Sequence, residues 1–206
     1  MIKSTTPLVR CDWPRDDADY IRYHDEEWGV PNTSDNALFE KLILEGFQAG
    51  LSWITILRKR EHFRKVFDGF DPERIVRYDA KKIAALMADP GIVRNRLKIA
   101  ATIDNAKAYL KLIETQSLSH LIWDLAGGKP QQNQFTVQNQ LPAETPTSKA
   151  ISKALKAHGF RFVGPTTVYA FMQSMGMVND HLVTCHRHTP CAKLAEKFKL
   201  PKSGKP

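Results

Sequence analysis

One segment of the chain reads Lys156-Ala157-His158-Gly159-Phe160-Arg161-Phe162-Val163-Gly164-Pro165, and it joins two stretches that have the residue pattern of helices. We expect the first helix from Ser148 to about His158 and the second from Pro165 to Met175. Two glycines bound the connection, and a proline suits a first helical turn, where its missing N–H costs no hydrogen bond. Free backbone N–H groups and the helix dipole would then face a phosphate. The segment predicts a helix-hairpin-helix over about 148–176, with an ordinary helix–helix connection as the alternative.

Helix patterns recur in the rest of the chain, which has no long alternating run of β-branched residues, so the predicted class is all-α. The expected helices cover 16–28, 35–49, 53–67, 72 onward, 80–88 and 93–115, with Ser34, Ser52, Asp71 and Asp79 at their starts. The last of them has the clearest apolar stripe, formed by Ile99, Ile103, Ala106, Leu110 and Ile113. Its basic residues, Lys98 among them, lie largely on other faces, which are either solvated or turned toward phosphate.

The length of 206 residues suits one large domain. We expect a single domain of two helical lobes over 9–190, a loop or linker over 127–147, and a basic flexible tail over 191–206. The formal net charge of +8 favours a polyanionic partner, although a merely basic surface is the alternative. No run of about 18 apolar residues occurs, and residues 1–7 have no apolar region, so we expect a monomeric, cytoplasmic protein without membrane contact.

A metal site is suggested by the spacing of His181-Leu182-Val183-Thr184-Cys185, because two ligands at i and i+4 share one face of a helix. Cys11 and His24 could complete a set of four nitrogen and sulfur ligands, which describes a structural zinc site. Three cysteines are an odd number, which argues against a disulfide framework. The alternatives are other ligands nearby (Cys191, His186 or His188) or a buried free cysteine with a core histidine.

A candidate binding carboxylate is Glu45, which a helical wheel places between Leu38 and Ala49 at the flank of an apolar arc. A carboxylate there must find a hydrogen-bond donor or raise its pKa, unless it extends to solvent. Trp53 follows the break at Gly50 and offers a large flat surface near Glu45, with core packing as the alternative.

The longest motifs of the chain are three ordered blocks. They read Arg10-Cys11-Asp12-Trp13, then Tyr20-Ile21-Arg22-Tyr23-His24-Asp25-Glu26-Glu27-Trp28-Gly29-Val30-Pro31, then Leu44-Glu45-Gly46-Phe47-Gln48-Ala49-Gly50-Leu51-Ser52-Trp53-Ile54-Thr55. With Phe160-Arg161-Phe162-Val163-Gly164 and Val178-Asn179-Asp180-His181, they resemble the bacterial DNA-3-methyladenine glycosylase I family over about residues 9–186.

The resemblance implies a helix-hairpin-helix fold and one structural Zn²⁺ held by Cys11, His24, His181 and Cys185. It implies a base pocket of Glu45, Tyr23 and Trp53, with Trp13, Tyr20 and Trp28 as neighbouring aromatic candidates and Glu45 as the catalytic candidate. We expect Trp53 and Tyr23 to sandwich a flipped base. The expected DNA contacts are Gly50, Leu51, Gly159, Phe160, Arg161, Val163, Gly164 and Thr166.

Two departures from the wider helix-hairpin-helix glycosylases are informative. Bifunctional members carry a Schiff-base Lys where this chain has Thr166, and most members carry a catalytic Asp where alignment places Asn179, next to Asp180. The family resemblance includes that missing Asp. It therefore implies a monofunctional glycosylase that hydrolyses N3-methyladenine out of duplex DNA, releasing the free base and leaving an abasic site. The alternatives are a glycosylase for another alkylpurine, a non-enzymatic DNA-binding module, and a catalytic zinc hydrolase.

Overall fold

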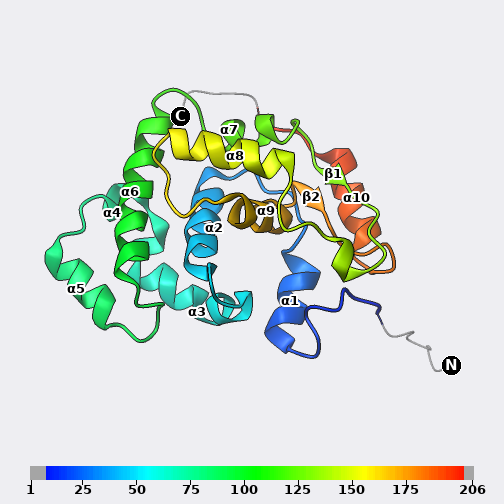
Figure 1. The fold of residues 1–206 in the computed structure, drawn as a ribbon, viewed down its shortest axis with the longest axis horizontal. Helices are drawn as coiled ribbons and strands as arrows, with labels where there is room; N and C mark the ends of the chain where they lie inside the picture. The colour runs from blue at the N-terminus through cyan, green and yellow to red at the C-terminus, as the bar shows by residue number, and fades with distance from the viewer. Residues whose placement is uncertain (1–7, 202–206) are drawn as a thin grey trace.

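The computed structural model describes residues 8–201, so the expectations for segments 1–7 and 202–206 lie outside the described residues. The architecture is mainly helical, as predicted, and Figure 1 shows the order of its elements. These are α1 (Ala18–Glu26), α2 (Asp35–Gln48), α3 (Trp53–Val66), η1 (Asp68–Phe70), α4 (Pro72–Ile75), α5 (Ala80–Ala88), α6 (Arg96–Ile113), α7 (Leu118–Leu125), β1 (Gln131–Gln132), η2 (Gln138–Gln140), α8 (Pro146–Ala157), α9 (Pro165–Ser174), β2 (Val178–Asn179) and α10 (His188–Lys197).

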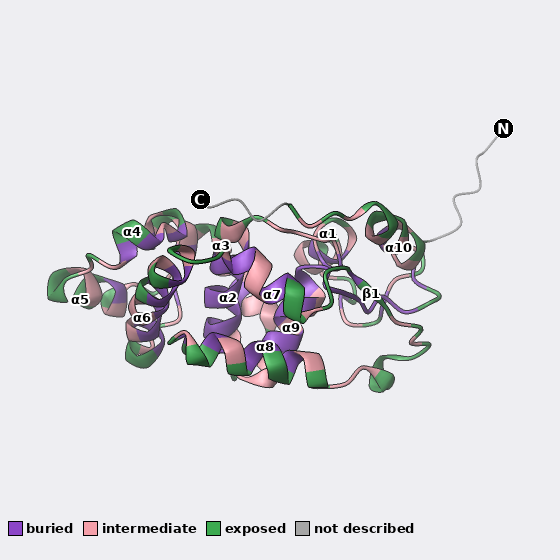
Figure 2. Ribbon diagram, turned by 90° about the horizontal axis from the view of Figure 1, so that it is seen from above, coloured by how far each residue is buried: buried purple, intermediate pink, exposed green. Residues whose placement is uncertain are grey.

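Helix α2 lies in the middle of the molecule, between an end that carries α4, α5 and α6 and an end that carries α1 and α10 (Figures 1 and 2). It packs on α3, α6, α7 and α9, and it is buried along most of its length. Leu38, Phe39 and Leu42 are almost fully buried and belong to the main apolar cluster. Residues on nearly every face of α2 are therefore held rigidly, which suits a helix that carries a binding carboxylate.

Side-chain caps explain where several helices begin. The Ser34 side chain accepts from the Ala37 N–H, and the side chains of Asp71 and Asp79 cap α4 and α5 in the same manner. Ser52 stands at the start of α3 as predicted, but its side chain makes no cap hydrogen bond. Its hydroxyl lies 2.9 Å from that of Thr55 instead.

The long helix differs from the prediction in length and in its buried face. Helix α6 begins after Asn95, whose side chain caps it, and ends at Ile113, whereas the prediction ran over 93–115. Ile99 and Ala106 of the expected stripe are buried, but Ile103, Leu110 and Ile113 are only partly so. Lys98 is buried with 8% of its surface exposed, so the prediction that it lies on a solvated or phosphate-facing side is wrong.

The segment predicted as a loop or linker is joined to the rest of the fold. Strand β1 within it pairs in parallel with β2, so that Gln131 faces Val178 and Gln132 faces Asn179. Phe135 and Leu141 pack against a second, smaller core cluster that includes Cys11 and Tyr23. The two-residue strands are too short to give an alternating sequence signal. Helix α7, capped by Ser117, was not predicted either.

The chain remains helical past residue 191, where the flexible tail was expected to begin. Helix α10 spans His188–Lys197 and buries Cys191. Phe198 then packs against the fully buried Trp123, with 4.3 Å between the ring centroids. The described residues contain no helix that is both long and apolar enough to cross a bilayer.

Candidate functional site

A cavity of about 240 Å³ contains all six predicted base-pocket residues in its wall. Helix α1 and its flanks contribute Trp13, Tyr20, Tyr23 and Trp28, while α2 and α3 contribute Glu45 and Trp53. Five further residues complete the wall and were not predicted: Gln48, Gln138, Leu141, Ala170 and Gln173. Gln138 and Leu141 come from the loop predicted as a linker, whose composition gave no sign that it folds over a cavity.

Glu45 is the carboxylate of this cavity, and it is buried with 3% of its surface exposed. Burial raises the pKa of the Glu45 carboxyl, and the nearby Lys41 ammonium opposes that rise. Lys41 lies one helical turn earlier, with Nζ 3.1 Å from Glu45 Oε1. Burial lowers the pKa of Lys41 to about 8, against the attraction of Glu45. The two side chains form a buried ion pair behind the cavity wall.

The same ammonium organises two aromatic residues. Lys41 Nζ donates to the Tyr23 hydroxyl oxygen at 2.9 Å and lies 3.3 Å from the centre of the Trp53 ring. Tyr23 and Trp53 have ring centroids 5.5 Å apart, with 44° between their planes. A base sandwiched between two parallel rings needs about 7 Å, twice the ~3.4 Å stacking distance of nucleic acid bases. The two rings are closer together than that and are tilted, so they do not form a parallel slot of that width in this structure.

Trp13 and Trp53 belong to the cavity wall, and the indole N–H group of each is buried in the protein. Both nitrogen atoms are buried and have no hydrogen-bond partner within the protein. A buried donor without an acceptor costs about 1–3 kcal/mol, so a polar ligand or water would relieve that cost. Trp13 also makes edge contacts with the rings of Tyr20, Tyr23 and Trp28. The cavity wall is therefore largely aromatic and contains one carboxylate.

A second group of side chains brings together Cys11, His24, His181 and Cys185, all of them buried. Their ligand atoms all lie within 4.8 Å of one another, and individual sulfur–nitrogen distances are 3.5 Å, 3.6 Å and 3.7 Å. Tetrahedral Zn²⁺ with ordinary bond lengths would separate a sulfur from a nitrogen by about 3.6 Å. The donor set and its spacing therefore fit zinc.

The surroundings of the four side chains also suit a metal. His24 Nδ1 lies 2.7 Å from Asp25 Oδ1, and His181 Nε2 lies 3.0 Å from the Trp28 carbonyl oxygen. Such contacts fix the tautomer of a ligand histidine and direct its other nitrogen to the metal. Burial lowers the pKa of His181, which favours the neutral form that ligates.

One premise of the sequence argument for this site is wrong. Residues 181–185 form a turn and not a helix, so His181 and Cys185 converge through that turn. The competing ligands lie elsewhere: His186 contacts the Val9 carbonyl, and His188 contacts that of Asn133. Cys191 is buried outside the four-residue group.

The predicted hairpin lies between α8 and α9. Gly159, Arg161 and Thr166 are exposed, whereas Phe160 and Val163 are buried, so the side chains of this last pair belong to the core. Gly164 stands at the N-cap of α9 with Pro165 in its first turn, as predicted. An unpredicted residue, Asn105 of α6, accepts from the Arg161 N–H at 2.6 Å and donates to its carbonyl at 3.1 Å.

The predicted turn at Gly50 and Leu51 is exposed and lies between α2 and α3. Gly50 has φ of +83°, a conformation that favours glycine, and Leu51 is 40% exposed. Gln48, which lines the cavity, donates from Nε2 to the Leu51 carbonyl at 2.5 Å. The turn is thus connected directly to the cavity wall.

Asp180 does not line the cavity. Its buried carboxylate accepts hydrogen bonds from Asn133 at 2.6 Å, Tyr169 at 2.7 Å and Gln173 at 2.8 Å. Asn179 donates to Gln132 and to the His188 carbonyl. Neither residue offers a free carboxylate to the cavity, whichever of the two the alignment places at the position of the missing Asp.

Comparisons with known proteins agree on one family. Residues 13–188 match the sequence profile of the family described as methyladenine glycosylase. The DNA-3-methyladenine glycosylase of Haemophilus influenzae is 49% identical over 184 residues, which cover 89% of this chain and 97% of that protein. A crystal structure of 3-methyladenine DNA glycosylase I superposes with a TM-score of 0.86 at 48% identity, covering 87% of this chain and all of that one. A variant of such an enzyme, crystallised in complex with 3-methyladenine, gives 0.83 at 37% identity, over 87% of this chain and 97% of that one.

Proposed function

The chain belongs to the methyladenine glycosylase family, and on that premise we propose that it removes N3-methyladenine from alkylated duplex DNA in base-excision repair. Hydrolysis of the N-glycosidic bond releases the free base and leaves an abasic site. The observation that carries this proposal is the cavity that combines aromatic walls with a buried carboxylate. A flipped purine complements both features, because it offers a flat π surface to the aromatic rings and an exocyclic amino donor to the carboxylate.

Release of this base requires little general acid catalysis by the protein. N3-methyladenine is cationic while it is attached to deoxyribose and leaves as a neutral base, so its departure needs no proton from the enzyme. That fits a cavity that Asp180 does not reach, because the Asp180 carboxylate is occupied by three internal donors. The demand is instead for recognition of the cationic base among abundant normal adenine.

Glu45 is the residue that we assign to recognition and catalysis. Its carboxylate would accept a hydrogen bond from the amino edge of the base and stabilise positive charge that develops on the sugar. Trp53 or Tyr23 would provide a stacking face with a cation–π preference for the methylated form, and Trp13, Tyr20 and Trp28 close the cavity around the base. Water then adds to C1′ of the deoxyribose.

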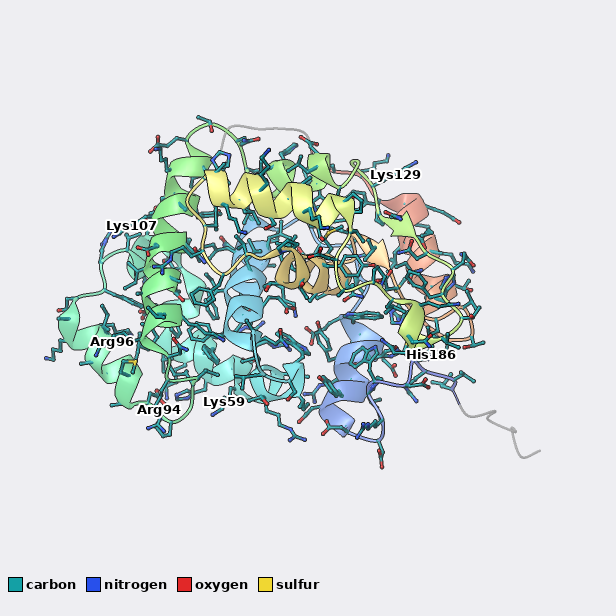
Figure 3. All side chains as sticks on the ribbon, viewed as in Figure 1. Lys59, Arg94, Arg96, Lys107, Lys129 and His186 are labelled. Carbon is teal, nitrogen blue, oxygen red and sulfur yellow. The ribbon has the colours of Figure 1, made fainter. Side chains whose placement is uncertain are left out.

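DNA binding is assigned to the hairpin and to the turn between α2 and α3. The N–H groups of Gly159, Phe160 and Arg161 are donated within the protein, so those of Phe162, Val163, Gly164 and Thr166 would hold a phosphate at the start of α9. The exposed Leu51 beside Gly50 would fill the gap left by the flipped base. Basic side chains Arg94, Arg96 and Lys107 lie along or just before α6 and would add nonspecific attraction (Figure 3). Thr166 carries no amine, so no Schiff base forms there and the strand stays intact.

We further propose that Cys11, His24, His181 and Cys185 bind one structural zinc ion. Four protein ligands leave no position for water, so the ion would stabilise the fold without taking part in hydrolysis. The ligands come from the N-terminal segment, α1 and the turn before α10, so the ion would tie the two ends of one monomeric domain together.

A panel of duplexes, each with one alkylated purine, tests the proposal. Release of 3-methyladenine well above that of other alkylpurines supports it. Preferential release of a different base would establish the same fold acting on another lesion. DNA binding without release of any base, together with no saturable binding of free 3-methyladenine, would indicate a DNA-binding module.

A further inference from the structure

Lys98 occupies an unusual place for a lysine. It lies in the first turn of α6, where a positive charge opposes the helix dipole, and only 8% of its surface is exposed. Burial lowers the pKa of its ammonium group. Because the helix dipole and burial both disfavour a lysine at this position, we expect its ammonium group to make a compensating contact elsewhere in the structure.

That contact is the C-terminal end of α2. Lys98 Nζ donates to the carbonyl oxygen of Phe47 at 2.8 Å and to that of Ala49 at 2.7 Å. The last carbonyls of a helix have no partner within the helix and carry the negative end of its dipole. Charge-assisted hydrogen bonds to them are stronger than neutral ones. Lys98 therefore caps α2 from a neighbouring helix.

The capped end leads directly into the exposed turn. Ala49 leaves the helical conformation with φ of −48° and ψ of 118°, and Gly50 follows with φ of +83°. Leu51 donates its N–H to the Gln48 carbonyl at 2.7 Å, so the turn folds back on the last residue of α2. The bond from Lys98 to the Ala49 carbonyl connects the start of this turn to α6, and the Ile54 N–H, just after the turn, donates to the Tyr20 hydroxyl oxygen at 3.0 Å.

The same face of α6 also holds the hairpin. Asn105, two turns after Lys98, exchanges its two hydrogen bonds with the backbone of Arg161. The next residue, Phe162, has φ of +57° and places its ring centre 6.0 Å from Lys98 Nζ. A Cβ on Gly46 would lie 3.2 Å from Phe162 Cβ, so glycine there lets the hairpin approach α2 closely. The α2–α3 turn and the hairpin, the two segments that we assign to DNA binding, therefore both contact α6.

We propose that Lys98 is a positioning residue, which holds the Gly50–Leu51 turn at a fixed place relative to the hairpin so that both engage one duplex. The proposal rests on the function proposed above, and it adds to that function a residue that touches neither base nor phosphate. Because Lys98 acts on the turn and not on the cavity wall, its loss should affect flipped-base capture from a duplex and spare binding of the free base.

The test compares Lys98→Met with a charge-matched control, Lys81→Met, whose lysine is exposed on α5 at the far end of the molecule (Figure 1). We expect Lys98→Met to lower kcat/KM on a 3-methyladenine duplex by about ten- to hundredfold, the scale of a displacement near 1 Å. The Kd for free 3-methyladenine should change less than about twofold, whereas a general loss of structure would weaken both together. The control should match the wild type in both measurements.

A second pair of variants keeps the proposal testable if Lys98→Met does not fold. Lys98→Arg keeps the cation and its donors but replaces a point charge by a longer planar head, so we expect it to fold and to lose duplex activity with free-base binding retained. If the effect passes through the turn, Leu51→Ala and Lys98→Arg should combine to less than the product of their separate effects. Duplex activity equal to wild type in the Lys98 variants that fold, or full multiplicativity, would overturn the proposal. A wild type that releases no 3-methyladenine would instead overturn the proposed function.

Discussion

At the scale of single residues, the cavity depends on a carboxylate that is buried and yet paired. Glu45 faces the aromatic wall, and Lys41 neutralises it from behind at 3.1 Å. Removing one member of a buried ion pair leaves the charge of the other without a partner, which destabilises the fold. Each substitution therefore needs separate measurements of ligand binding and of stability.

Glu45→Gln keeps the size of the side chain and one acceptor oxygen but loses the charge. A charge-assisted hydrogen bond is worth roughly 1.5–3 kcal/mol, against about 1 kcal/mol for a neutral one. We expect free 3-methyladenine to bind about tenfold more weakly by calorimetry, with affinity for undamaged DNA unchanged. Glu40→Gln is the matched control, because Glu40 lies on the same helix and pairs with Arg64 outside the cavity. Equal binding by wild type and Glu45→Gln would show that the carboxylate does not recognise the base.

Lys41→Met should change the pH dependence of binding. Lys41 lowers the pKa of Glu45, so its removal raises that pKa, and the carboxylate is lost at a higher pH as the solution is acidified. Base binding, measured from pH 8 downward, should therefore fail at a higher pH in Lys41→Met than in the wild type. Unchanged pH profiles would contradict the ion-pair argument.

The same lysine gives a stability signature with a defined sign. Its pKa falls from an ordinary value of 10.5 to about 8 on folding, so between these values the unfolded chain binds more protons. Stability should rise with pH through that window because of Lys41, and Lys41→Met should remove this contribution.

Sequence reasoning at this scale found residues that line the cavity and missed the lysines that contact them. Glu45, Tyr23 and Trp53 belong to a dense motif. Lys41 was not singled out, and Lys98 was expected on a solvated or phosphate-facing side. Their partners are a Tyr hydroxyl, a Trp ring and two distant carbonyls, which no local pattern encodes. The predicted sandwich by Trp53 and Tyr23 also depended on an inter-ring distance that the sequence does not contain.

At the scale of elements, contacts between distant parts of the chain join its ends. The four-residue Cys and His group links the segment before α1 to the turn before α10. Bound zinc contributes its binding free energy to folding because the unfolded chain has no preformed site.

Cys11→Ser should lower zinc content and thermal stability together. Cys191→Ser is the matched control, because Cys191 is equally buried but lies outside the four-residue group. Metal analysis and thermal unfolding on the same samples check both variants. A zinc-free Cys11→Ser protein with wild-type Tm and full activity would contradict a structural metal.

Helix α10 should contribute to stability through its last contact. Phe198→Ala removes the ring that packs on Trp123 at 4.3 Å and should cost about 1–3 kcal/mol in urea unfolding, less than a fully buried Phe. Leu194→Ala serves as the control, because Leu194 is 41% exposed on the same helix. No difference between the two would mean that the chain after α10 adds little to the fold.

Elements with strong local signals were predictable, and those fixed by tertiary contacts were not. Ser34, Asp71 and Asp79 marked helix starts correctly, because a cap is a local hydrogen bond. His181 and Cys185 have the spacing of ligands on a helix, but residues 181–185 form a turn, and Leu182 and Cys185 within it belong to the second core cluster. The basic composition after Cys191 suggested a flexible tail, whereas one apolar face and Phe198 are enough to dock it.

At the scale of the whole molecule, the cavity, the Gly50–Leu51 turn and the hairpin all lie next to α2. Residues of α1, α2 and α3 line the cavity, and the hairpin approaches α2 at Gly46, where an added Cβ would lie 3.2 Å from Phe162 Cβ. The net charge of +8 supplies long-range attraction to DNA, which weakens with salt. The sequence predicted the helical class and favoured a polyanionic partner, but the contacts that join the α2–α3 turn and the hairpin to α6 required the structure.

The most direct test of the account is a single-turnover assay on a duplex with one 3-methyladenine, quantifying free base and strand breaks together, with borohydride present in a parallel sample. We predict stoichiometric release of 3-methyladenine, a strand that breaks only after alkali, and no covalent enzyme–DNA adduct, because Thr166 offers no amine. Glu45→Gln should release the base more slowly. Failure of the wild type to release the base would contradict the glycosylase assignment, and a trapped adduct would contradict the monofunctional mechanism.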